Sequence, residues 1–81
     1  MNMDVQEKVI QVLINIFQVS PDKITTETTS DNVENWDSMN HISMILALEQ
    51  EFGISYDEEQ AVSMLSVGEI IEVTKGKLGL Q

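Results

Sequence analysis

Hydrophobic residues near the start of the chain recur with the period of a helix that buries one face. Within residues 3–17 they are separated by steps of four, three, one, three and one residues. The positions are Val5, Val9, Val12, Leu13, Ile16 and Phe17. Pro21 disfavours helical backbone in the residue before it, so this helix is expected to end by about Val19. Ser20 and Pro21 then offer a cap and a first position for one further turn.

Residues 18–36 are mostly polar and predict a long connection. A connection longer than about 12–15 residues without regular structure is uncommon in a compact domain, and is usually a functional or partly disordered segment. Its large apolar side chains are Val19, Ile24, Val33 and Trp36. We expect the last three of these to hold the connection against the core.

Residues 37–52 contain no glycine or proline and predict the best-marked helix. Asp37 is a favourable N-cap, and Gly53 is of the type favoured just past a helix end. The residues on one side of its helical wheel are Ile42, Ile45, Leu48 and Phe52. Met39 and Leu46, with Ser43 between them, lie along a second stripe that we expect a partner to touch. Single exposed apolar residues are also ordinary on soluble proteins, so periodicity alone leaves both explanations open.

Two shorter helices are predicted in the last third of the chain. Residues 57–60 place acidic side chains in the first turn of a short helix, where they complement the helix dipole. The apolar side of this helix is predicted to be Ala61, Val62, Met64 and Leu65. Ser66 and Glu69 have the spacing of a capping box, and the helix that follows is expected to stop near residues 75–77, at Gly76.

These elements predict a single domain over residues 1–81 with an all-α fold. It is a small four-helix bundle with a long loop between helices one and two and a short third helix. We find no internal repeat, strand alternation or low-complexity tract in the sequence.

Composition narrows the possible functions. The 81 residues include 14 Asp and Glu against 4 Lys and Arg, a net charge of −10, and no cysteine. This length excludes a large self-contained enzyme, and the absence of cysteine excludes disulfides and a cysteine nucleophile. The charge disfavours nucleic acid and favours basic protein surfaces. The sequence has no signal-peptide pattern and no apolar run of about 20 residues, so we expect a cytoplasmic monomer without membrane insertion.

Ser38 is the first candidate for chemistry. One residue inside the second helix, free backbone N–H groups and the positive end of the dipole suit a phosphate attached to its hydroxyl. An Asp-Ser pair is also a common capping pattern at the start of a helix, so its position alone does not show whether Ser38 is modified. A Ser38–His41 hydrolase is disfavoured because the chain has no Gly-x-Ser-x-Gly elbow and little room for an oxyanion hole. We therefore expect no catalytic residue and no metal site, with His41 on the surface.

Three segments together resemble the acyl carrier protein family. They are residues 35–39, Asn-Trp-Asp-Ser-Met; residues 46–54, which include Glu-Gln-Glu-Phe-Gly; and residues 66–71, Ser-Val-Gly-Glu-Ile-Ile. The family signature is Asp-Ser-Leu at the start of the second helix, and Met39 replaces the leucine here. The resemblance covers nearly the whole chain, since length, acidity, the long first loop and the four-helix order all agree.

The resemblance implies that a phosphopantetheinyl transferase, with coenzyme A and Mg²⁺, attaches 4'-phosphopantetheine to Ser38. The thiol of this arm would carry acyl groups as thioesters, and Asp37 could contribute a ligand to the transferase-bound Mg²⁺. The protein would not be an enzyme itself. It would dock acyl-loading, synthase and acyltransferase enzymes that have basic docking surfaces. The expected docking residues are Met39, His41, Ser43, Leu46 and Glu49.

The family also implies a cavity in which an acyl chain slides between the helices. The matching positions are Leu48, Tyr56 and Met64, and a bulky Tyr56 would shorten such a cavity. An ordinary core filled by flexible side chains explains the same residues equally well.

Departures from the family pattern bear on the pathway. Trp36 stands where carriers of fatty acid synthesis usually have a small residue, and Asn40 and Ser43 stand where those carriers are often acidic. Trp-Asp-Ser with a following His resembles carriers of specialised pathways for modified lipids, surface polysaccharides or secondary metabolites. A peptidyl or aminoacyl carrier is an alternative. So is an unmodified acidic interaction module, with divalent ions at residues 57–59.

The excess of acidic residues predicts a stability that depends on salt. Self-repulsion among these carboxylates lowers the free energy of unfolding at low ionic strength, and added ions screen it. We expect the melting temperature to rise when NaCl or MgCl₂ is added. A melting temperature that is insensitive to both salts would contradict this prediction.

Overall fold

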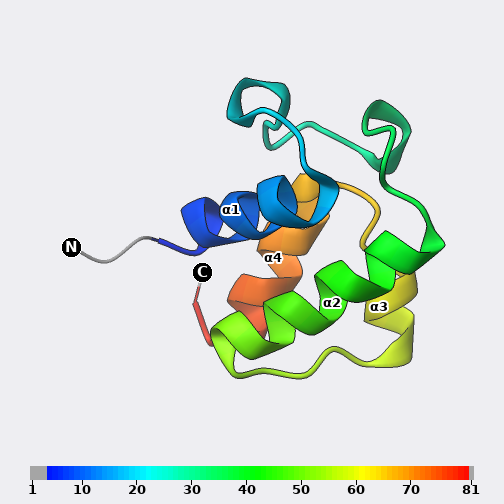
Figure 1. Ribbon diagram of the computed structural model, residues 1–81. Helices are drawn as coiled ribbons and strands as arrows, with labels where there is room; N and C mark the ends of the chain where they lie inside the picture. Colours follow the sequence, from blue (N-terminus) through cyan, green and yellow to red (C-terminus); the bar gives the residue numbers. More distant parts are fainter. Residues whose placement is uncertain (1–3, 81) are drawn as a thin grey trace.

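Four α-helices and two single-turn 3-10 helices form the part of the chain that the structure, a computed structural model, describes: residues 4–80 (Figure 1). The elements are α1 (Val5–Phe17), η1 (Pro21–Lys23), η2 (Ser30–Asn32), α2 (Ser38–Phe52), α3 (Glu58–Ser63) and α4 (Val67–Lys77). This confirms the predicted all-α fold with a long first connection and a short third helix. Met3, the predicted start of the first helix, lies outside the described residues. None of the helices described is long and apolar enough to cross a membrane.

Side-chain caps set most of the helix starts. Asp37 Oδ1 accepts a hydrogen bond from the Asn40 N–H at 2.8 Å, and Ser66 Oγ accepts one from the Glu69 N–H at 3.2 Å. Both caps satisfy N–H groups that a helix leaves without partners in its first turn. Gly53 follows α2 with a φ of 65°, a left-handed conformation that glycine adopts without steric cost. The predicted limits of α2 are therefore confirmed.

α4 ends at Lys77, within the predicted limit, but the glycine that follows its end is not the predicted one. Gly76 lies inside the helix, which continues to Lys77, and it is Gly79 that has a positive φ, 74°. Backbone hydrogen bonds from Leu80 to Lys75 and from Gly79 to Gly76 close this end in the manner of a Schellman motif. A glycine inside a helix costs only about 1 kcal/mol relative to alanine, so it does not have to end the helix.

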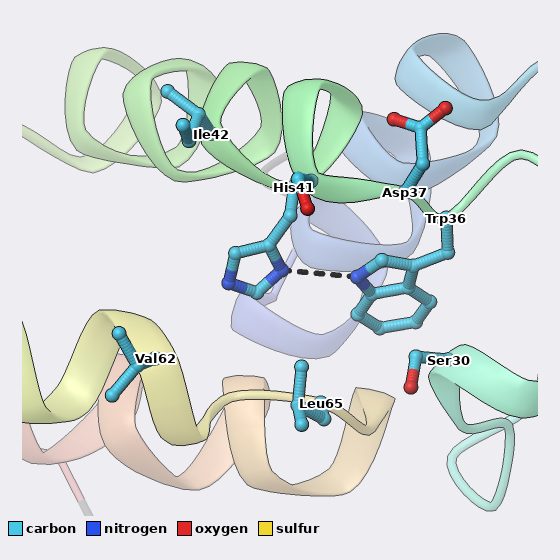
Figure 2. Close-up of a pocket in the computed structure, with 8 residues that line it drawn as sticks. Ser30, Trp36, Asp37, His41, Ile42, Val62 and Leu65 are labelled. Carbon is cyan, nitrogen blue, oxygen red and sulfur yellow. Dashed lines mark hydrogen bonds between the residues drawn. The ribbon is translucent and has the colours of Figure 1, made fainter.

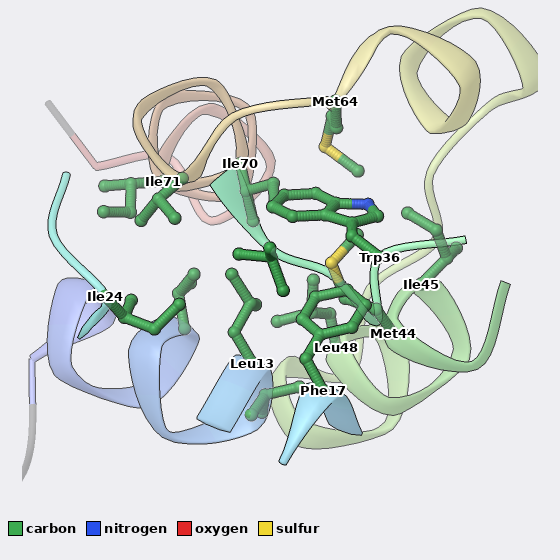
Figure 3. Close-up of a cluster of buried hydrophobic side chains, with 14 of the residues drawn as sticks. Leu13, Phe17, Ile24, Trp36, Met44, Ile45, Leu48, Met64, Ile70 and Ile71 are labelled. Atoms are coloured by element: carbon green, nitrogen blue, oxygen red, sulfur yellow. The ribbon is translucent and has the colours of Figure 1, made fainter. Parts of the chain in front are cut away.

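The hydrophobic core lies where α1 packs against α2 and α4 (Figure 3). The apolar stripe of α1 is buried as predicted, except that Ile16 is only half-buried. Ile24, Val33 and Trp36 are also buried, which confirms that they fasten the long connection to the core.

The orientation of α2 is partly different from the prediction. Ile42 was expected on the packing side, but it is 60% exposed, whereas Met44 is fully buried beside Ile45 and Leu48. At about 100° per residue, these three buried residues centre on an arc that includes His41 and leaves Ile42 about 110° away. A helical wheel of the apolar residues alone does not show that a histidine occupies part of the inward face.

The apolar side predicted for α3 is also wrong in part. Val62 is 68% exposed and Leu65 is 46% exposed, while Met64 is fully buried. A helix of only six residues reaches the core mainly through one end, so it cannot bury a complete apolar stripe. The two exposed side chains instead face the start of α2, as described below.

The long connection is ordered by backbone hydrogen bonds to the segment between α3 and α4. The Ser30 N–H donates to the Leu65 carbonyl at 2.8 Å, and the Val67 N–H donates to the Thr28 carbonyl at 2.9 Å. η1 has the predicted Ser20 and Pro21 start, although the Ser20 side chain makes no cap hydrogen bond. η2 was not predicted; Thr29 caps it.

A buried polar pair joins the α2–α3 connection to α4. Tyr56 Oη lies 2.6 Å from Thr74 Oγ1, and the Tyr56 N–H donates to Glu49 Oε2 at 2.9 Å. Burial raises the pKa of the Tyr56 phenol above its ordinary 10.0; the hydrogen bond with Thr74 lowers that pKa, and the charge of Glu49 raises it.

This pair predicts a loss of stability at alkaline pH. A phenol whose pKa is higher in the folded than in the unfolded state stabilises the fold below pH about 10 and loses that contribution as pH rises further. We expect the urea midpoint to fall above pH 10, with a shallower fall in Tyr56→Phe because this variant cannot ionise there. At neutral pH, Tyr56→Phe should lower the free energy of unfolding by about 1–3 kcal/mol, because the Thr74 hydroxyl is left buried without a partner. If the urea midpoint fell equally with pH in the wild type and in Tyr56→Phe, this interpretation would be contradicted.

Candidate functional site

Ser38 is the first residue of α2, and its side chain is exposed. The turn before it is fixed from both sides. The carboxylate of Asp37 caps the helix, and Asn40 Nδ2 donates to the Asn35 carbonyl at 2.9 Å. Asn35 Nδ2 in turn donates to the Phe17 carbonyl at 2.8 Å, which ties this turn to the end of α1. The Ser38 hydroxyl is thus presented to solvent from a rigid support.

An open pocket of about 520 Å³ begins at Ser38 (Figure 2). It lies between the start of α2, the end of α3 and η2. The lining residues are Ser30, Trp36, Asp37, Ser38, His41, Ile42, Val62 and Leu65. The exposed apolar side chains of α2 and α3 that the wheels had assigned to the core therefore form part of the walls of this pocket.

Trp36 and His41 form a hydrogen-bonded bridge across the inner wall. Trp36 Nε1–H donates to His41 Nδ1 at 3.0 Å, and His41 Nε2 lies 2.7 Å from the Ala61 carbonyl oxygen of α3. An indole N–H only donates and a carbonyl oxygen only accepts, so both bonds are satisfied by a neutral imidazole with its hydrogen on Nε2. The Trp36 ring also stacks on Phe17, with 4.8 Å between the ring centroids. We call these three residues, Trp36, His41 and Ala61, the Trp36–His41–Ala61 bridge.

The bridge corrects the sequence-based view of His41 as a surface side chain. The residue is half-buried, and both of its ring nitrogens are committed within the fold. Removing one partner would leave a donor or acceptor unsatisfied, at a cost of about 1–3 kcal/mol. His41 therefore holds α3 against the start of α2.

The same geometry bears on the chemistry of Ser38. A serine hydroxyl is a weak nucleophile unless a base or metal assists it. Both nitrogens of His41 are occupied by other partners, and Asp37 uses one carboxylate oxygen on the helix cap. Within residues 4–80, no three His, Asp or Glu side chains are arranged to hold a metal ion, including residues 57–59. Neither His41 nor the capping oxygen of Asp37 is therefore free to act as a base toward Ser38.

Three of the five predicted docking residues are exposed, and the other two, His41 and Glu49, are half-buried. Met39 and Leu46 are 80% and 57% exposed, and Ser43 is also exposed. Glu49 is half-buried and accepts the hydrogen bond from Tyr56, so its carboxylate orders the α2–α3 connection. Ile42 was not predicted in this surface, although Met39, Ile42 and Leu46 have the helical spacing i, i+3, i+7 that could have identified it.

The predicted cavity residues lie in the core. Leu48 and Met64 are fully buried and Tyr56 is nearly so, and none of them lines the pocket beside Ser38. Their role as an acyl cavity stays a prediction. Ser30 was not predicted at the site; it enters the pocket from η2 because the long connection is hydrogen-bonded to Leu65, in the segment between α3 and α4.

Several known proteins that are similar to this chain have the same name. Proteins named acyl carrier protein from Thermosynechococcus vestitus and Amoebophilus asiaticus are each 28% identical over 75 residues, which is 93% of this chain and 93% and 94% of theirs. One from Nitratidesulfovibrio vulgaris is 31% identical over 93% of this chain and 99% of its own. No family model matches the chain.

A solved structure agrees in fold. The solution structure of holo acyl carrier protein from Geobacter metallireducens superposes with a TM-score of 0.82 at 22% identity. The match covers 95% of this chain and 88% of that one.

The cap at Asp37 predicts a measurable effect on stability. Asp37→Ala should lower the free energy of unfolding by about 1 kcal/mol, because the first turn of α2 loses its acceptor. Asp37→Asn should change it by much less, since its side-chain oxygen can still accept from the Asn40 N–H. Urea unfolding followed by circular dichroism measures both. Glu34→Ala is the charge-matched control, because Glu34 is exposed and lies outside the caps; equal losses in all three variants would contradict a cap.

Proposed function

Because the chain belongs to the acyl carrier protein family, we propose that Ser38 carries 4'-phosphopantetheine and that acyl intermediates are held as thioesters on this arm. The observation that carries the proposal is the position of Ser38. It is exposed at the first turn of α2, within the Asp-Ser pair that matches the family signature, and it opens onto a pocket.

The residues around Ser38 fit such a group. A phosphodiester on this hydroxyl would lie at the positive end of the α2 dipole, which is favourable for an anion. The neighbouring pocket of about 520 Å³ is bordered by apolar side chains on α2 and α3, against which the uncharged part of an arm could lie. When bound, the group supplies a thiol, which this chain lacks because it has no cysteine.

Attachment requires a transferase, since nothing in the site activates the serine. Ser38 Oγ would form a bond to the phosphorus next to the pantetheine of coenzyme A. The pyrophosphate bond would break, adenosine 3',5'-bisphosphate would leave, and the serine proton would pass to a base of the transferase. One oxygen of Asp37 caps α2. The second could therefore bind the Mg²⁺ of the transferase without loss of the cap.

The exposed surface of α2 supports docking of partner enzymes. Met39, Ile42 and Leu46 provide an apolar stripe, with Ser43 beside it. The net charge of −10 would steer basic surfaces of transferase, acyl-loading, synthase and acyltransferase partners toward it. His41 and Glu49 would act on this surface indirectly, because their side chains hold the fold.

Trp36 supports a carrier of specialised lipid or secondary-metabolite synthesis over one of general fatty acid synthesis. Its indole occupies the inner wall of the pocket, where the small residue usual in fatty acid carriers would leave space. A peptidyl or aminoacyl carrier would use the same serine and the same pocket, so identification of the loaded group decides between them.

The proposal is tested by incubating the protein with coenzyme A, Mg²⁺ and a promiscuous phosphopantetheinyl transferase. We expect intact mass spectrometry to show the gain of one phosphopantetheine group, and none in Ser38→Ala. Ser30→Ala is the matched control, because it removes a second serine from the same pocket and should be labelled like the wild type. An unmodified wild-type protein would favour an acidic interaction module, and labelling at another residue would overturn the assignment of Ser38.

A further inference from the structure

Trp36 separates the pocket at Ser38 from the interior of the bundle. Trp36 lines the pocket and also belongs to the buried core, where its ring stacks on Phe17 (Figure 3). The fully buried Met44 and Met64 belong to the same core cluster and do not line the pocket. A group that moved from the pocket into the core past Trp36 would therefore have to displace this indole.

His41 locks the indole in this position and spans the space between α2 and α3. It accepts from the Trp36 N–H (Figure 2) and donates to the Ala61 carbonyl, so one imidazole ties both helices to the indole. Moving the indole would break its bond with His41 and its stack on Phe17, and parting α3 from α2 would break the bond to Ala61. Each buried polar group released in this way would need a new partner.

We propose that the Trp36–His41–Ala61 bridge closes the interior of the bundle to the carried group. This inference rests on the proposed attachment of the arm to Ser38. The carried group then stays outside the core and rests against Ile42, Val62 and Leu65 in the surface pocket. Trp36 and His41 are thus specificity-determining residues, and the cargo is a short acyl group whose chain does not need burial in the protein interior. The acyl cavity predicted at Leu48, Tyr56 and Met64 is closed in this protein.

Two physical points favour the surface pocket as the resting place. The pocket is already open beside the attachment point, so an arm tethered there meets its walls at a high effective concentration. Its apolar walls are also largely exposed: Ile42 is 60% exposed and Val62 68%. Covering them with the arm and a short acyl group removes apolar surface from water without disturbing the core.

The test compares two loaded forms of the wild type. A promiscuous transferase with acetyl coenzyme A or octanoyl coenzyme A loads the short or the long group onto Ser38, and intact mass confirms loading. Methyl NMR then follows the pocket residues Ile42, Val62 and Leu65 and the core residues Met44 and Met64. We expect both groups to shift pocket methyls and to leave core methyls in place.

Variants of the bridge provide the second comparison. His41→Leu removes both hydrogen bonds, whereas His41→Gln can still accept from Trp36 and donate to Ala61 through its amide. In octanoyl-loaded His41→Leu we expect shifts at the core methyls. We also expect cleavage of its octanoyl thioester by hydroxylamine to slow about tenfold or more, because a thioester that is about 90% sequestered reacts only through its exposed fraction. His41→Gln should behave as the wild type. If His41→Leu does not fold, Trp36→Phe, which removes only the indole N–H and part of the ring, gives the same readout.

The possible results separate this inference from the proposed function. Core-methyl shifts in octanoyl-loaded wild type would overturn the inference while leaving the carrier function in place. The inference would also be overturned if the core-methyl signals of octanoyl-loaded His41→Leu did not shift. It would be overturned too if a loaded group shifted neither the pocket-methyl nor the core-methyl signals. Failure to label Ser38 at all would overturn the proposed function and this inference with it.

Discussion

One imidazole organises the part of the molecule that surrounds Ser38. His41 connects the indole of Trp36 to the backbone of α3, and the indole in turn stacks on Phe17 at the end of α1. Three helices are therefore linked through two aromatic rings and a histidine. α3 has only six residues and little apolar surface of its own in the core, so its position depends strongly on this connection.

The fold could be predicted largely from the sequence because its main determinants are local. The stripe of α1, the Asp37 cap, the Gly53 stop and the N-cap at Ser66 are short-range signals, and the structure confirms them. The capping box predicted at Ser66 is only half formed, because the Glu69 carboxylate accepts from the Ser66 hydroxyl and not from its backbone N–H. The exposures of Ile42 and Val62 could not be predicted in this way. They depend on where α3 lies, and that position follows from contacts between residues that are 20 positions apart, such as His41 and Ala61.

For the candidate site, the sequence was sufficient to recognise the family and to propose Ser38 as the attachment residue, but not to describe the surroundings of the serine. The residue types of Trp36 and His41 were noticed, yet their hydrogen bond joins a side chain of the connection to one on the helix, and no periodic pattern encodes it. Ser30 was missed because η2 reaches the pocket only through its backbone bond to Leu65. Such contacts arise from tertiary packing, which no helical wheel represents.

The backbone bond between Ser30 and Leu65 couples two walls of the pocket that come from distant parts of the sequence. A displacement of the end of α3 must carry η2 with it, since the connection and the α3–α4 segment are also joined between Thr28 and Val67. The two sides of the pocket mouth are therefore joined by backbone hydrogen bonds and are not independent edges. A displacement of either side would strain these hydrogen bonds, so the width of the entrance beside Ser38 depends on both segments together.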